Sequence, residues 1–167
     1  MPEDTTTLQQ TIAQLQTRVA ELEQSLARQT EQYALLQEVI DQLPYAIYWK
    51  DPSLVYRGCN QRFASDLGLA SPNAVIGHTD ADLGWKEAEF ALFQEIDRRI
   101  IATRMAEYDD QETVVHANGI REWFETHKVP LIDQVGTVFG VLATYNNITA
   151  RKQAEATVLA QASLLQD

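Results

Sequence analysis

The sequence predicts an α+β protein in which one antiparallel sheet domain lies between two flanking helices. Apolar residues over positions 8–43 recur at alternating spacings of four and three, which is the period of a coiled-coil helix. Further along, segments of β-type composition precede and follow a helical stretch, and the last three are joined by turns too short for a parallel crossover. We therefore divide the chain into a coiled-coil helix over 1–43, a domain over 44–148 and a C-terminal helix over 149–167.

The first helix has an apolar seam and a defined end. The expected seam residues are Leu8, Ile12, Leu15, Val19, Leu22, Leu26, Tyr33, Leu36 and Ile40. No Gly or Pro interrupts this pattern, and Pro44 ends it. β-branched residues at a with Leu at d favour a parallel two-stranded coiled coil, so we expect a parallel homodimer. A single amphipathic helix folded back onto its own domain is the alternative.

The domain is expected to open with a hairpin and a short helix. Aromatic and β-branched residues on both sides of a Pro-Ser turn predict two paired strands over 45–59. Asn60 is a good N-cap for a helix that begins directly after it, and Gly68 is a typical stop.

A longer helix and three strands complete the predicted domain. Apolar residues spaced four apart predict a helix over 86–104. Strands are expected over 107–115, 120–130 and 135–147, and their short connections require an antiparallel meander. The helices then lie between the two groups of strands and cover one face of the sheet.

Composition and charge exclude several classes of protein. The 167 residues carry a formal net charge of −11, so we expect neither nucleic acid nor an anionic membrane as a partner of this segment. No apolar run is long enough to span a bilayer, and residues 1–10 lack a signal-peptide pattern, which favours a cytoplasmic location. The single cysteine, Cys59, rules out an intrachain disulfide and is expected to be a buried, inert thiol.

Four segments, in this order, resemble the PAS family of sensory domains. They are "LPYAIYWKDPSLVYRGCNQRFASDLGL", "IGHTDADL", "WFETHKVPLID" and "GVLATYNNITARK", and the resemblance covers roughly residues 40–152. It implies a PAS fold, with a five-stranded antiparallel sheet, helices on one face and a last strand that leads into a signalling helix.

The resemblance also implies a function. It indicates a dimeric sensor or regulatory module of a bacterial signalling protein, of the two-component histidine kinase or cyclic-di-nucleotide enzyme type. The C-terminal helix stops in mid-pattern at Asp167, so we expect an effector domain to follow it. The alternative is a ligand-free dimerisation or docking module.

PAS proteins hold haem, flavin or small metabolites between sheet and helices, and some hold no known ligand. We expect neither haem nor flavin here, because the 86–104 helix has no histidine and Cys59 lies outside the flavin-reactive motif; His78 is expected to face solvent. No metal-ligand spacing is present, so no metal is expected. A small-molecule ligand therefore stays open, and the cofactor is unassigned.

The pocket wall is predicted from strand and helix periodicity together with the resemblance. The candidates are Trp85, Phe93, Ile96, Trp123, Val141, Ala143 and Tyr145. Each is equally consistent with ordinary core packing. For Tyr145 the two alternatives are a hydroxyl that contacts the ligand and a packed ring with its hydroxyl at the rim.

The signal junction is expected at Asn147, Thr149 and Arg151. By the resemblance, Asn147 replaces the acidic residue with which many family members bind an arginine at this point. That ion pair cannot form here, so we expect a neutral and weaker joint. We expect Asn147→Asp to raise thermal stability or to alter effector coupling in the full protein.

Catalysis is not expected. The sequence has no Gly-rich phosphate loop and no nucleophile motif. The carboxylates of Asp80 and Asp82 are the nearest approach to a catalytic pair. The resemblance implies instead that this segment is structural and that these residues cap short helices.

Overall fold

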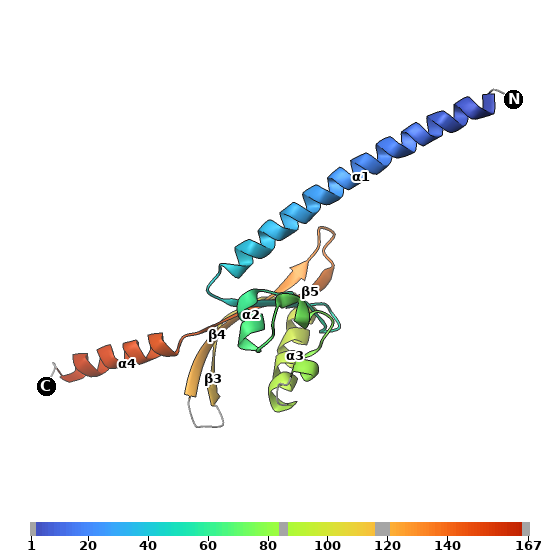
Figure 1. Cartoon of the computed structure of the whole chain (residues 1–167). Helices are drawn as coiled ribbons and strands as arrows, with labels where there is room; N and C mark the ends of the chain where they lie inside the picture. Colours follow the sequence, from blue (N-terminus) through green and yellow to red (C-terminus); the bar gives the residue numbers. More distant parts are fainter. Residues whose placement is uncertain (1–2, 84–86, 116–120, 165–167) are drawn as a thin grey trace. The chain divides into compact units, whose positions relative to one another are not determined.

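The computed structural model describes residues 3–83, 87–115 and 121–164, and it divides into two compact units (Figure 1). The first unit is Met1–Gln42 and the second is Leu43–Asp167. Among the described residues, no helix combines the length and apolar character needed to cross a membrane.

The first unit is a single long helix, α1 (Glu3–Asp41), as the heptad pattern predicts. Eight of the nine expected seam residues, from Leu8 to Leu36, have 48 to 65% of their surface exposed, and Ile40 is half-buried. The helix therefore presents its apolar stripe uncovered over most of its length.

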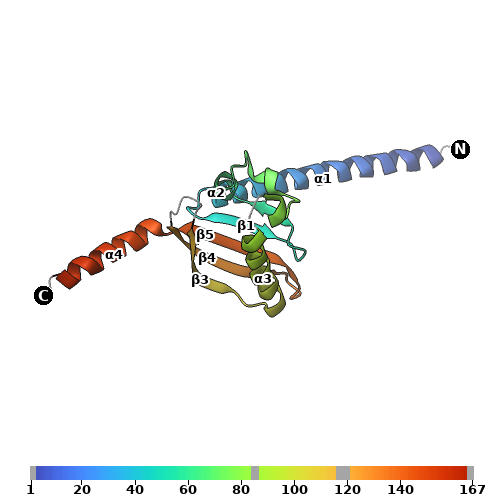
Figure 2. The same ribbon diagram turned by 90° about the horizontal axis from the view of Figure 1, so that it is seen from below.

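The second unit contains the predicted five-stranded antiparallel sheet, in the order β2-β1-β5-β4-β3 (Figure 2). The strands are β1 (Ala46–Lys50), β2 (Tyr56–Cys59), β3 (Glu107–Val115), β4 (Arg121–Ile132) and β5 (Val138–Asn147). The N-terminal hairpin joins the C-terminal meander through β1 and β5, which pair from Ala46↔Tyr145 to Lys50↔Val141. This pairing places the last strand in the middle of the sheet, beside the first.

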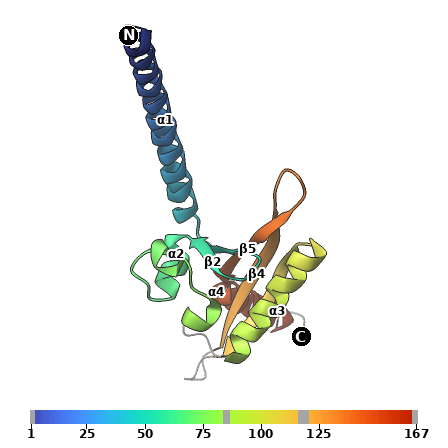
Figure 3. The ribbon, with the colours of Figure 1, turned by 90° about the vertical axis from the view of Figure 1, so that its right-hand side faces the viewer.

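Helices lie between the two groups of strands, as expected. They are α2 (Gln61–Asp66), the 3-10 helices η1 (Pro72–Val75) and η2 (Asp80–Leu83), and α3 (Glu87–Thr103). Asn60 caps α2 by accepting from the Phe63 amide at 3.1 Å, and it also accepts from the Ile47 amide at 2.9 Å, which holds the helix against β1. Figure 3 shows α3 running alongside the sheet. After β5, α4 (Thr149–Leu164) begins within two residues.

The core has two clusters on the same face of the sheet. Phe63 of α2 packs with Tyr48, Tyr56 and Ala143, whereas Ile96 and Ile100 of α3 pack against Val141. Because Val141 and Ala143 are two apart on β5, both point to the helical side.

Gly140 is required by a close approach of the backbone. A Cβ at this position would clash with the Lys50 carbonyl oxygen, whereas the three atoms nearest to a Cβ at Gly58 all belong to the Trp49 ring. We expect Gly140→Ala to lower the free energy of unfolding by roughly 1–3 kcal/mol, since a strand backbone cannot move aside as a ring can. Urea denaturation checks this, with Gly58→Ala as the milder variant; an equal or larger loss for Gly58→Ala would contradict it.

Candidate ligand cavity and helix junction

A cavity of about 440 Å³ lies between the sheet and the helices of the second unit. Six aromatic rings line its walls, namely Tyr48, Tyr56, Phe63, Phe93, Phe124 and Tyr145. Pro44 and Ala46 also line it, together with seven polar residues: Lys128 and Thr126 on β4, Arg62 and Asp66 on α2, and Glu122, Asn146 and Asn147 beside the start of α4. This size is within the range of small-molecule sites in proteins.

The cavity stays open because large and small residues alternate between β1 and β5. Tyr48 lies opposite Ala143 and Tyr145 lies opposite Ala46. Each tyrosine is therefore paired with a small residue; Ala46 lines the cavity, and Ala143 is buried in the core cluster.

Of the seven expected pocket residues, Phe93 and Tyr145 line the cavity. Ile96, Val141 and Ala143 are buried in the two core clusters and do not line it. Trp85 lies outside the described residues.

Trp123 was expected in the pocket wall, and this expectation is wrong. Phe124 and Thr126 line the cavity, so by strand alternation Trp123 points to the opposite face of the sheet. There the Lys152 ammonium of α4 lies 5.6 Å from the centre of its ring. Trp123 thus belongs to the helix junction.

Tyr145 has its hydroxyl at the rim of the cavity. The hydroxyl donates to the Asp66 carboxylate at 3.1 Å. Burial, and then the Asp66 charge, raise the pKa of Tyr145, so the hydroxyl remains a donor at neutral pH. The hydroxyl thus has a protein partner, as the packed alternative requires, and its contact with a ligand stays a prediction.

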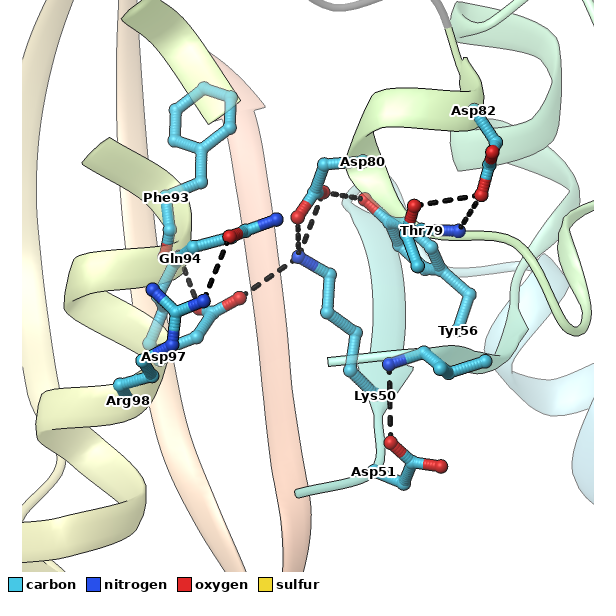
Figure 4. A network of polar contacts seen from close by, with 12 residues as sticks. Lys50, Asp51, Tyr56, Thr79, Asp80, Asp82, Phe93, Gln94, Asp97 and Arg98 are labelled. Atoms are coloured by element: carbon cyan, nitrogen blue, oxygen red, sulfur yellow. Dashed lines mark hydrogen bonds and ion pairs between the residues drawn. The ribbon is translucent and has the colours of Figure 1, made fainter. Parts of the chain in front are cut away.

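Beside the cavity lies a buried charge network that was not predicted (Figure 4). The Lys50 ammonium donates to both Asp80 oxygens, at 2.7 and 2.8 Å, and to Asp97 at 2.9 Å. Lys128 pairs with the other Asp97 oxygen at 2.5 Å. The side chains of Lys50, Asp80 and Asp97 are at most 1% exposed, so water contributes almost nothing to their solvation.

Tyr56 completes the network. Its hydroxyl donates to Asp80 at 2.7 Å, and the Lys50 ammonium lies 4.7 Å from the centre of its ring. Burial raises the pKa of Tyr56, with the neighbouring Tyr48 and Asp80 adding to the effect, which keeps the phenol protonated. The expectation that Asp80 caps a short helix is therefore wrong, since its oxygens serve this network. Asp82 does cap, accepting from the Thr79 amide and hydroxyl, both at 2.7 Å.

His78 and Cys59 lie where they were expected. His78 is exposed in its loop, and Cys59 is buried and forms no disulfide. Among the described residues, no group of three His, Cys, Asp or Glu side chains is arranged to hold a metal ion.

The expected signal junction is tied to β4 by several contacts. Asn147 accepts from the Thr149 amide at 3.0 Å and donates to Glu122 at 3.0 Å. The Trp123 amide donates to the Thr149 hydroxyl at 2.8 Å. The Ile148 amide donates to the Trp123 carbonyl, also at 2.8 Å.

Arg151 has an acidic partner, although position 147 carries no acid. It donates to Glu125 of β4 at 2.6 Å. The hydrogen bond from Arg151, with a smaller contribution from its charge, holds the pKa of Glu125 below its usual value. The expectation of a neutral joint is therefore wrong, because the ion pair at this junction comes from β4.

A sequence model described as the PAS fold matches residues 40–153. The chain belongs to the PAS family. No curated protein matches it.

Solved structures with a similar fold agree with this assignment. The Vibrio cholerae VqmA dimer is 26% identical with a TM-score of 0.60, and the match covers 73% of this chain and 52% of VqmA. VqmA bound to DPO is also 26% identical, with a TM-score of 0.57 and coverage of 71% and 57%. This PAS chain therefore spans about half the length of the VqmA chains that it matches. The PAS domain of Bordetella pertussis BvgS, at 21% identity and a TM-score of 0.59, covers 79% of this chain and 98% of its own and shows the fold alone.

Asn147→Asp should destabilise the domain, contrary to the expectation from sequence. The new carboxylate would face Glu122, which now accepts from the Asn147 amide. We expect a loss of about 1 kcal/mol in the free energy of unfolding, since a hydrogen bond becomes a like-charge contact. Thermal unfolding measures this. The double variant Glu122→Gln with Asn147→Asp should recover most of the loss, and a stabilised single variant would contradict the assigned geometry.

The Glu125–Arg151 pair should depend on pH. Because the folded-state pKa of Glu125 is lowered from 4.5, the pair contributes stability above the unfolded-state pKa. This contribution is lost as the pH falls through the lowered value. Melting temperatures between pH 7 and pH 3 should therefore fall more steeply for the natural chain than for Glu125→Gln. Glu95→Gln, at an exposed position of α3, is the control and should follow the natural chain; parallel curves for all three would refute the pairing.

Proposed function

We propose that this chain is the sensory module of a bacterial signalling protein, which binds a small molecule in the cavity and relays its presence through α4. The proposal rests on one observation, which is that the cavity extends from the buried core to the start of α4. Its lining runs from buried Tyr56 and Lys128 to Glu122 and Asn147, two of the residues that hold the first turn of α4. An occupant can therefore act on the junction by direct contact.

An open cavity favours a sensor over a ligand-free docking module. The docking alternative assumes a filled core, whereas here a cavity of about 440 Å³ is lined by six aromatic rings and several polar side chains. We propose no catalytic role, because the charged groups of the buried network bind one another and none is placed as a nucleophile with an adjacent base.

The VqmA structures support a small-molecule ligand and widen the choice of effector. VqmA binds DPO and is described as a LuxR-type receptor with target DNA. A DNA-binding domain is therefore a third candidate for the effector beyond the C-terminal helix, besides a histidine kinase and a cyclic-di-nucleotide enzyme. That the PAS segment itself leaves nucleic acid unbound stays a prediction, supported by its net charge of −11. A cytoplasmic location is part of the same proposal.

A parallel homodimer completes the proposed function. The exposed stripe of α1 is too long to be covered by one small domain, and its β-branched a positions suit two parallel strands. Dimerisation would place two cavities and two exit helices in one assembly.

Ligand binding can be tested with the full chain and a panel of small uncharged metabolites that includes DPO. A true ligand should raise the melting temperature and change hydrogen exchange in the first turn of α4, because the cavity reaches Asn147. Thr126→Phe, which narrows the cavity from β4, should abolish both effects while the domain stays folded. A panel without any stabilising member, or a ligand whose effect survives Thr126→Phe, would refute the sensor proposal.

Dimerisation can be tested by placing a charge in the seam. Leu22→Lys should leave the domain folded and weaken the dimer at least about tenfold, since a buried lysine would face its own copy. Analytical ultracentrifugation measures the dissociation constant. Gln24→Lys adds the same charge two residues further along α1, outside the seam, and should remain dimeric; equal behaviour of the two variants would disprove the seam.

A further inference from the structure

One buried lysine of the cavity wall is already neutralised by its own chain. Lys128 projects from β4 with 5% of its side chain exposed, and it lines the cavity. Its ammonium is paired with Asp97 at 2.5 Å, and Asp97 in turn accepts from Lys50. The four charges of Lys50, Asp80, Asp97 and Lys128 therefore sum to zero.

The two lysines differ in how many of their hydrogen-bond donors are used. Lys50 directs its three donors at the two Asp80 oxygens and at Asp97, and it does not line the cavity. Lys128 donates to Asp97 and, at a long 3.5 Å, to the Phe93 carbonyl. The described part of the chain supplies no third acceptor, so one N–H of Lys128 is available to an occupant.

The surrounding walls limit what that occupant can be. Phe93 lies with its ring centre 5.7 Å from the Lys128 ammonium, and Phe124 lines the cavity from the same strand as Lys128. The hydroxyls of Tyr56 and Tyr145 are bound to Asp80 and Asp66. The aromatic walls thus favour a flat apolar body.

Charge is the second constraint. A ligand group with a net charge would bring an uncompensated charge next to Lys128 and Asp97, whose charges are already balanced within the buried network, which is costly. An uncharged acceptor, in contrast, gains a charge-assisted hydrogen bond from Lys128 without disturbing the balance.

We propose that Lys128 is the residue through which the cavity recognises its ligand, and that the ligand is an uncharged aromatic molecule with one hydrogen-bond acceptor directed at the ammonium. This inference rests on the proposed function, since it assumes that the cavity takes a small molecule. Asp97 acts as a positioning residue, because it orients the ammonium without touching the ligand.

Four probes of one ring each test the ligand class on the full chain: benzamide, benzoate, benzylammonium and toluene. Their dissociation constants can be measured by NMR titration. Benzamide should bind at least about tenfold tighter than each of the others, because it alone is uncharged and offers a strong acceptor. This ranking needs no variant and so does not depend on whether a mutated chain folds.

Two charge-balanced double variants test the role of Lys128. Lys128→Met with Asp97→Asn removes the lysine that lines the cavity and leaves Lys50 paired with Asp80. Lys50→Met with Asp80→Asn removes the other half of the network and leaves Lys128 paired with Asp97. The first variant should lose the preference for benzamide over toluene, and the second should keep it.

The outcomes separate this inference from the sensor proposal. Benzoate binding as tightly as benzamide overturns the ligand class. A preference for benzamide over toluene that survives the loss of Lys128 overturns the role of Lys128. In both cases the cavity remains a binding site. No saturable binding of any probe to the natural chain also overturns it, and the metabolite panel with Thr126→Phe then decides the sensor function independently.

Discussion

The Lys50 ammonium is the point at which the elements around the cavity are fixed to one another. It extends from β1 and contacts Asp80 of η2 and Asp97 of α3, and Asp97 continues the chain of contacts to Lys128 of β4. Burying four charges costs solvation free energy that their mutual attraction only offsets, so such a network is a poor source of stability. What it supplies is position, since each charge is satisfied in one arrangement only. The helix α3, the 3-10 helix η2 and the strands β1 and β4 are thereby held at set distances from one another, and the cavity keeps its shape.

The cavity and the junction with α4 lie on the two opposite faces of one strand, β4. Phe124, Thr126 and Lys128 face the helices and line the cavity, whereas Trp123 and Glu125 contact the exit helix. Because side chains alternate along a strand, a ligand on one face and α4 on the other share the same short piece of backbone. At Glu122 and Asn147 the two sets meet, since both residues line the cavity and bond to each other at 3.0 Å.

Periodic features of this fold could be predicted from the sequence, and paired charges could not. The heptad pattern predicted α1, and Asn60 predicted the start of α2, because both features depend on residues that are close together in the chain. The network joins residues 30 and 47 positions apart, which no local pattern reveals. One signal was available: Asp97 interrupts the apolar face of α3 between Phe93 and Ile100, and Lys50 follows Ala46 and Tyr48 on the inner face of β1. A charge at a core position predicts a buried partner, although not which one.

The error at Trp123 has a similar origin. A strand pattern specifies that neighbours alternate, but a shift of one residue exchanges the faces. In β4 the inner face carries Thr126 and Lys128, which are polar, while the outer face carries Trp123. A prediction based on hydrophobicity therefore placed Trp123 on the wrong face of the sheet. The ion pair of Arg151 was missed because its acid, Glu125, lies 26 residues earlier, on a different strand from the one that leads into α4.

The attachment of α4 to two adjacent strands has a mechanical consequence. The helix grows out of β5, yet Arg151 and Thr149 hold it to β4 through Glu125 and Trp123. Sliding of β4 along β5 would displace one anchor against the other and so apply a torque about the axis of the helix. A helix continuous with a single strand and anchored nowhere else would merely follow that strand, whereas this attachment would convert in-plane shear into rotation.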